Sequence, residues 1–186
     1  QRIVKISGSE ASIKQESPSE TGREHWQIER HLKKTISNFV ILRCNFFMQN
    51  LLDQAANMVR NNNSITMPFY KNTAFSFIDA NDIAACAVEA LIQPKYAGKT
   101  LYLTGAPSSY SELIQSLTLH LNQPVSYKRV PLWLAYIAMR FNGMSNRMVC
   151  HQLEMAKLFM LGAGAKNTNN VSEMLGRPPE NLDEFI

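Results

Sequence analysis

The residues of this chain that could do chemistry cluster just after segments that look like β-strands. Ser7-Gly8 closes a short alternating segment, residues 45–50 follow an apolar one, and Thr104-Gly105-Ala106 closes a third. In an open α/β sheet, ligands bind beyond the carboxyl ends of the strands. The sequence therefore predicts a ligand site along one edge of a sheet, formed by these three groups of residues.

Several other kinds of chemistry lack the residues they need. No G-x-S-x-G occurs, which disfavours a nucleophilic serine on a strained elbow. The histidines at 25, 31, 120 and 151 form no H-x-x-x-H, and no C-x-x-C occurs, so no metal site is predicted. None of the eight glycines falls into G-x-G-x-x-G, the spacing that a dinucleotide-binding strand–turn–helix uses for the pyrophosphate.

Composition indicates one globular domain without nucleic-acid chemistry. The chain has 186 residues, of which 45% are hydrophobic and 18% charged, enough to bury a core. The net charge of +4 comes from scattered residues such as Lys33, Lys34, Arg129 and Arg147. A scattered excess is typical of a solvated surface, although a mildly basic cleft for a phosphate-bearing cofactor fits it equally well.

Cysteine usage and hydropathy bear on the compartment. Cys44, Cys86 and Cys150 are far apart, odd in number and in apolar surroundings, which predicts buried free thiols in a reducing, cytoplasmic compartment. No run of 18 apolar residues exists, so neither a membrane span nor a membrane partner is expected. The most apolar stretch, residues 130–141, is short and is broken by Arg140.

The elements that must position these residues alternate between strand and helix. Strands are predicted at 2–8, 38–44, 98–105 and 125–130, and extended segments at 65–79. Helices are predicted at 23–35, 45–61, 79–92, 108–122, 131–141 and 147–161, and a polar loop at 9–22. The alternation indicates βαβ units, and the nearly continuous apolar residues of 38–44 indicate a parallel strand covered on both faces. The fold class is therefore α/β.

Some individual side chains have structural interpretations at this stage. Trp26, Ile28 and Leu32 are expected on the buried face of the first helix, and Ile83, Ala87, Val88 and Leu91 on that of the third. Glu29 is spaced to pair with Lys33, so a solvated or structural role is expected for it. Asp82 is expected to serve the dipole at a helix start, and Ser109 with Glu112 to form a capping box.

The order of these segments resembles a known family. "VKISG", "HWQIERHL", "FVILRCNFFMQNLL", "FSFIDANDIAACAVEAL", "GKTLYLTGAPSSYSELIQSL" and "GRPPENLDEF" are similar, in this order, to the second half of NmrA-like proteins. These are atypical short-chain dehydrogenase/reductases, which include NAD(P)H-dependent quinone reductases and nucleotide-sensing regulators. The resemblance implies part of a doubly wound, Rossmann-like parallel sheet, followed by a smaller, mostly helical substrate region.

The resemblance also implies how the chain is divided. Residues 1–105 would be the C-terminal half of the NAD(P)-binding domain, with an insertion near 62–76 that belongs to the substrate region. Residues 106–186 would mainly bind substrate and form a lid. The glycine motif and the residues that choose NADP over NAD would precede Gln1, so a longer gene product is expected and either cofactor is compatible.

The same resemblance assigns cofactor-binding residues. They are Ser7, Gly8, His25, Phe47, Met48, Gln49 and Asn50. His25 stands where the family has His or Lys near the nicotinamide ribose, and 47–50 match the segment that lies against the nicotinamide. The tyrosine of the wider superfamily's Tyr-x-x-x-Lys pair would stand at position 21, which is Thr21, so no catalytic residue is assigned. His25 as an exposed first-turn residue, and Phe47 and Met48 as core, remain alternatives; Phe46 is expected in the core.

The implied activity is hydride transfer from NAD(P)H to a small quinone-like or carbonyl acceptor. The acceptor is expected under the helices of 131–164, against Met144, Met148, Met155 and Met160, which core packing explains equally well. The alternative is a non-catalytic NADP-binding sensor that acts through protein partners, and a homodimer is also compatible. A sugar-nucleotide epimerase is disfavoured because the tyrosine is absent. The loop 9–22 and the helices of 131–164 are expected to order over the site when ligand binds.

Overall fold

A three-stranded parallel sheet forms one half of the molecule in the computed structural model, which describes residues 1–51 and 55–186. Its strands are β1 (Ile3–Ser7), β2 (Phe39–Cys44) and β5 (Thr100–Leu103), in the order β1-β2-β5. Ile3 pairs with Phe39 and Ile41 with Thr100, both ladders being parallel. The central β2 is almost wholly buried, as its continuous apolar residues predict.

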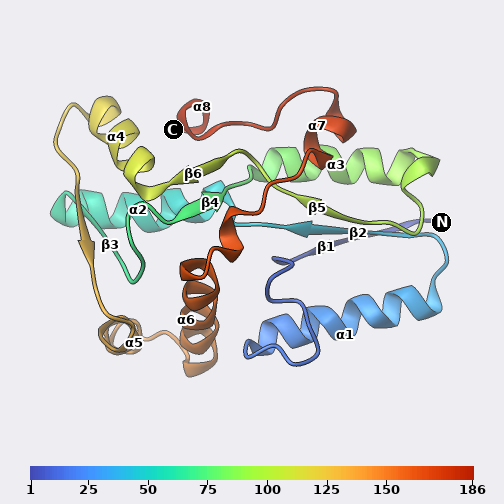
Figure 1. The fold of residues 1–186 in the computed structure, drawn as a ribbon, viewed down its shortest axis with the longest axis horizontal. Coiled ribbons are helices and arrows are strands. Elements are labelled where there is room, and N and C mark those ends of the chain that lie inside the picture. Colours follow the sequence, from blue (N-terminus) through green and yellow to red (C-terminus); the bar gives the residue numbers. More distant parts are fainter.

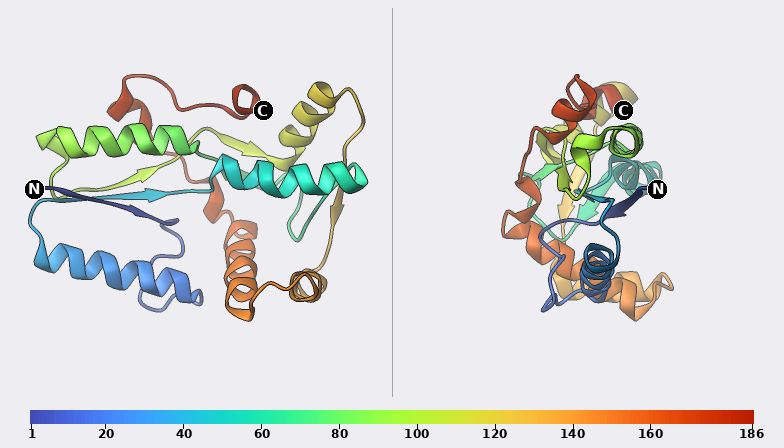
Figure 2. Two further views of the ribbon diagram at one scale, coloured as in Figure 1. Left: turned by 180° about the vertical axis from the view of Figure 1, so that it is seen from behind. Right: turned by 90° about the vertical axis from the view of Figure 1, so that its right-hand side faces the viewer.

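Helices cover both faces of this sheet. α1 (Glu20–Thr35) packs on one face and α3 (Ala80–Ile92) on the other (Figures 1 and 2). Ser19 caps α1 by accepting a hydrogen bond from the Gly22 amide, and Asp79 caps α3 at the Asn81 amide. The cap at Ser19 explains why α1 begins at Glu20 instead of the expected residue 23.

The other half of the molecule is built from short strands and helices around α2 (Met48–Asn62) (Figure 1). β3 (Ser64–Met67) pairs in parallel with β7 (Ser126–Arg129), and β4 (Ala74–Ser76) pairs antiparallel with β6 (Pro107–Ser109). The remaining elements are η1 (Pro94–Tyr96), α4 (Tyr110–Leu121), α5 (Leu132–Phe141), α6 (Asn146–Met160), η2 (Ala163–Ala165), α7 (Asn170–Leu175) and α8 (Leu182–Phe185). No helix in the described part of the chain combines the length and hydropathy that crossing a membrane requires.

Within the described residues, the core consists of a small hydrophobic cluster of Leu32, Phe39 and Ile41, between α1 and β2, and of two larger clusters. One lies between the sheet, α3 and α7 and contains Val40, Leu42, Ile78 and Leu103. The other joins α2, β3, β4, α4 and α6, where the rings of Phe75 and Phe77 stack with centroids 5.4 Å apart. Ser109 caps α4 as expected, its hydroxyl accepting from the Glu112 amide. The second half of the expected capping box differs, because the Glu112 carboxylate accepts from the Ser108 and Ser109 hydroxyls.

Several sequence-based expectations about helix faces are wrong. Ile28 is 49% exposed, and in α3 Val88 and Leu91 are 52% and 50% exposed; the buried positions of α3 include Cys86 and Ala90 instead. The helices meet the sheet along narrow stripes, so apolar residues at the margin of each stripe stay in solvent. Cys150 is exposed, whereas Cys44 and Cys86 are buried, and all three are free thiols.

Asp82 does more than serve the helix dipole. Its carboxylate is buried, forms an ion pair with Arg177 at 2.6 Å, and accepts a hydrogen bond from the Glu180 amide at 2.7 Å. It therefore fastens the segment between α7 and α8 to the start of α3.

Candidate functional site

A cavity of about 360 Å³ lies at the carboxyl ends of β1 and β2, where the sequence predicts a ligand site. We call it the edge cavity. Four segments line it: the loop after β1, the start of α1, the junction of β2 with α2, and α6. The lining residues are Gly8, Ser9, Ser12, Thr21, Gly22, His25, Cys44, Asn45, Phe46, Phe47, Asn50, His151, Gln152, Met155 and Phe159.

The structure brings together part of the predicted set. Gly8, His25, Phe47 and Asn50 line the edge cavity, and Ser7 lies beside His25 with its hydroxyl 3.3 Å from the ring Nδ1. Their assignment to a cofactor stays a prediction.

The other predicted residues have structural partners. Met48 is 2% exposed in the hydrophobic core, and the Gln49 amide bonds the Asp79 carboxylate and the Ala80 amide at the start of α3. Thr104 does not line the edge cavity; its hydroxyl bonds the Asn167 side chain at 3.0 Å instead.

His25 is placed and tuned by its neighbours. Its Nδ1 lies 3.3 Å from the Lys5 ammonium as well as from Ser7. Burial lowers the pKa of His25, the Lys5 charge lowers it further, and the Glu29 carboxylate opposes both. The imidazole is therefore neutral at neutral pH. Because the ammonium can only donate, Nδ1 is the acceptor and Nε2 carries the proton.

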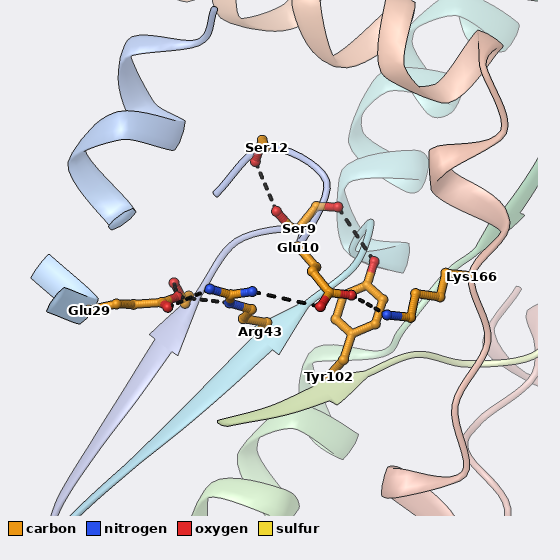
Figure 3. A network of polar contacts seen from close by, with 8 residues as sticks. Ser9, Glu10, Ser12, Glu29, Arg43, Tyr102 and Lys166 are labelled. Atoms are coloured by element: carbon orange, nitrogen blue, oxygen red, sulfur yellow. Dashed lines mark hydrogen bonds and ion pairs between the residues drawn. The ribbon is translucent and has the colours of Figure 1, made fainter. Parts of the chain in front are cut away.

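A chain of charged side chains ties the loop after β1 to the sheet (Figure 3). Arg43, on β2, bonds the Glu29 carboxylate through Nε at 3.1 Å and Nη2 at 2.7 Å, and its Nη1 lies 3.8 Å from Glu10. Glu10 also pairs with Lys166, from the segment after α6. The loop is thereby held over the strand ends from two sides.

Glu29 is a buried structural anion, which corrects the expected pairing with Lys33. It is 2% exposed and accepts a third hydrogen bond from the Ser7 hydroxyl at 2.7 Å. Burial alone would raise the pKa of Glu29, but the hydrogen bonds from Arg43 and Ser7, together with the positive charges of Arg43 and Lys33, outweigh it and lower the pKa below its ordinary value. The carboxylate is thus ionised at neutral pH.

Sequence reasoning missed His151, which lies across the edge cavity from His25. The Ser19 hydroxyl lies 2.7 Å from its Nδ1 and also accepts from the Gly22 amide, so the hydroxyl proton is directed at the imidazole. Burial lowers the pKa of His151. No spacing in the sequence signals this contact, because it depends on how α6 packs against α1.

A second cavity, of about 380 Å³, adjoins the edge cavity, and we call it the apolar cavity. Its wall includes Met67, Phe69, Ala135, Met139 and Met144. The two cavities share Phe46, Gln152, Met155 and Phe159. The rings of Phe46 and Phe159 meet edge to face, with centroids 5.9 Å apart.

Of the four methionines expected to form an apolar wall, two line a cavity. Met144 and Met155 line the apolar cavity, whereas Met148 and Met160 are 46% and 38% exposed. A larger cavity, of about 590 Å³, lies elsewhere, along α4 and α8. Two of the residues predicted at the ligand site, Met48 and Ala106, line this cavity instead of the edge cavity.

The donor set of the edge cavity suits an organic ligand with amide and hydroxyl groups. Within the described residues, no cluster of three or more His, Cys, Asp or Glu could hold a metal ion. The Asn45 amide donates to the Gly164 carbonyl at 2.8 Å, while its Oδ1 is buried without a partner in the described part of the chain. A buried acceptor of this kind favours a ligand or water that can donate a hydrogen bond.

Several known proteins are similar to this chain in sequence or in fold. The chain is 30% identical over 171 residues to the NAD(P)H azoreductase of Xenophilus azovorans, covering 91% of this chain and 59% of that protein. The NADPH-dependent quinone oxidoreductase of Escherichia coli, solved with NADPH, superposes with a TM-score of 0.85 at 19% identity, over 99% of this chain and 64% of that one. NmrA, a negative transcriptional regulator solved with NADP, superposes with a TM-score of 0.71 at 13% identity, over 100% and 63%.

This chain therefore spans less than two thirds of the length of each of these relatives. The superpositions establish a Rossmann-like α/β fold, as expected from the sequence. The model of the NmrA-like family matches residues 10–186, and the chain belongs to that family.

Proposed function

We propose that the protein is an NAD(P)H-dependent oxidoreductase that passes hydride to a flat, apolar acceptor of the quinone-like or carbonyl class. The observation that carries this proposal is the contact between two cavities of different character. The edge cavity, whose lining is the more polar of the two, meets the apolar cavity at Phe46, Gln152, Met155 and Phe159. A cofactor and an acceptor bound on the two sides of this boundary would be neighbours, as hydride transfer requires.

The edge cavity offers groups for the nicotinamide end of NADP or NAD, which supplies the hydride when bound. His25 has an Nε2–H for ribose hydroxyls, and Asn50 has an exposed amide for the carboxamide. Phe47 can pack against the ring. The solved relatives with NADPH and NADP support this cofactor.

The apolar cavity fits the acceptor. Methionine and aromatic side chains form an adaptable wall, and a site of this kind excludes water from the transfer. The azoreductase at 30% identity supports a conjugated, flat acceptor. The unpaired thiols of Cys44 and Cys86 fit a reducing, cytoplasmic setting.

Few side chains of the edge cavity could supply the proton that a reduced acceptor takes up. Its lining holds two imidazoles, His25 and His151, and one thiol, Cys44, whose pKa burial raises to about 12. Such a thiol is inert at neutral pH. The same scarcity supports the rival function, an NADP sensor without turnover that acts through protein partners.

The test is NADPH binding and oxidation by the full-length protein, with a panel of benzoquinones, naphthoquinones and azo dyes. We expect Ala138→Phe, which fills the apolar cavity, to raise KM for the acceptor at least tenfold and to leave the Kd of NADPH within twofold. Met148→Phe, on the exposed side of α6, is the matched control and should change neither. Tight NADPH binding without oxidation of any acceptor would favour the sensor, and absence of binding of both NADPH and NADH would exclude both functions.

A further inference from the structure

The outward face of α5 is apolar, which is the reverse of an ordinary surface helix. Trp133, Ile137 and Phe141 follow one another at four-residue intervals and are 64%, 50% and 93% exposed. Tyr136 lies beside them at 38%, while the inward-facing Ala135 is buried. A helix on a water-exposed surface normally carries charged residues at such positions. We call these four exposed residues the α5 face.

The stretch of sequence around α5 carries positive charge and no acid. Residues 113–153 contain four Lys or Arg and not one Asp or Glu. Arg147 is neutralised by Glu20 and Glu24 of α1, and Arg129 stacks on the Tyr70 ring. Lys128 and Arg140 are exposed, and Arg140 is one turn from Tyr136 and Ile137 on the outward side.

We propose that the α5 face docks on the surface of an anionic phospholipid bilayer. Trp, Tyr and Phe on one side of a helix, with Lys and Arg at its margin, are the side chains that bind at the headgroup boundary of such membranes. With ten residues, α5 is far too short to cross, so it would lie in the plane of the interface.

A second copy of the chain is a less suitable occupant. The chain carries a net charge of +4, and a twofold contact through the α5 face would bring Lys128 and Arg140 of both copies together. No acid between residues 113 and 153 could compensate them. An anionic surface matches the charge and the apolar side chains at once.

The α5 face lies on the same helix that lines the apolar cavity, and this position gives membrane docking a function. The inward side of the same helix lines the apolar cavity through Ala135, Ala138 and Met139. A lipophilic acceptor dissolved in the bilayer would then reach the cavity past α5. This use rests on the proposed function, whereas the docking does not.

The test is flotation of the full-length protein with vesicles of phosphatidylcholine, alone or mixed with phosphatidylglycerol. We expect binding to the mixed vesicles that weakens with salt, and a drop of at least tenfold in Trp133→Ser/Phe141→Ser. Lys128→Gln/Arg140→Gln should lower binding to the mixed vesicles. The control is Ile28→Ser/Ile92→Ser, at positions 49% and 65% exposed on α1 and α3, which should bind as the parent does.

Equal binding of Trp133→Ser/Phe141→Ser and the parent, or no binding by the parent, would overturn the proposal. Sedimentation of a parent dimer that this variant dissociates, without vesicle binding, would assign the α5 face to a second copy. Oxidation of NADPH with a water-soluble quinone should survive in the variant. Vesicle binding by a parent that oxidises no NADPH would refute the proposed function alone.

Discussion

Replacing Glu29 with glutamine tests whether the buried anion organises the edge of the sheet. The carboxylate receives three hydrogen bonds, two from Arg43 and one from the Ser7 hydroxyl. Glutamine keeps the shape, removes the charge, and turns an NH₂ group toward a guanidinium that can only donate. Arg43 would then remain 17% exposed beside Glu10, whose carboxylate is 3.8 Å away.

The expected loss follows from these partners. Removing one member of a buried ion pair typically costs about 3–5 kcal/mol, because the other charge stays desolvated. Here Glu10 can partly replace Glu29, and Arg43 keeps some contact with water. We therefore expect the free energy of unfolding at pH 7 to fall by about 2–3 kcal/mol, below the range for a fully buried pair.

Urea denaturation at several pH values provides the assay. The pKa of Glu29 is lowered in the folded state, so its stabilisation is complete above the ordinary value of 4.5 and disappears as the pH falls through the folded pKa. The difference between the parent and Glu29→Gln should therefore shrink in acid. Glu24→Gln is the matched control on the same helix: Glu24 is 46% exposed, and its loss should cost at most about 1 kcal/mol. Equal effects of the two variants, or a Glu29→Gln difference independent of pH, would refute the reasoning.

Three further predictions follow. His25→Ala and Asn50→Ala, in the full-length protein, should each weaken NADPH binding about fivefold to tenfold, the value of one hydrogen bond, without changing the melting temperature; titration calorimetry checks this. NADPH should increase the hydrogen-exchange protection of the loop 9–19 and of the helices of 131–164, and equal protection in both states would leave them as scaffold. Asp82→Asn should loosen the segment after α7, seen as faster proteolysis near Arg177, since a neutral amide cannot form the ion pair.

Much of the sheet half could be predicted from local pattern. The apolar run of β2, the alternation of β1 and the caps at Asp79 and Ser109 each reflect a preference that neighbours in sequence satisfy. Because parallel strands end at the same edge, strand order and direction also place Gly8 and Asn50 beside one cavity.

What local pattern could not predict is which long-range contact each polar residue makes. Lys33 is four residues from Glu29, but the partner is Arg43, which β2 brings beneath the helix. Thr104 follows directly on β5, one residue beyond its end, and the segment after α6 comes back over β5 and binds it. In both cases a tertiary contact with better burial replaces the nearest local one.

The position of α6 determines whether the edge cavity and the apolar cavity adjoin each other. This helix supplies Gln152, Met155 and Phe159, three of the four residues that line both. Its contacts with α1 are polar: the Arg147 pairs with Glu20 and Glu24, all about half exposed, and the Ser19–His151 hydrogen bond. Exposed ion pairs contribute about 0–1 kcal/mol each, so separating this end of α6 from α1 costs little. Phe159, at the other end, is 3% exposed against Phe46 and Phe75 and stays fixed. A small rotation of α6 about Phe159 would therefore open the edge cavity at His151 and leave the aromatic boundary between the two cavities in place.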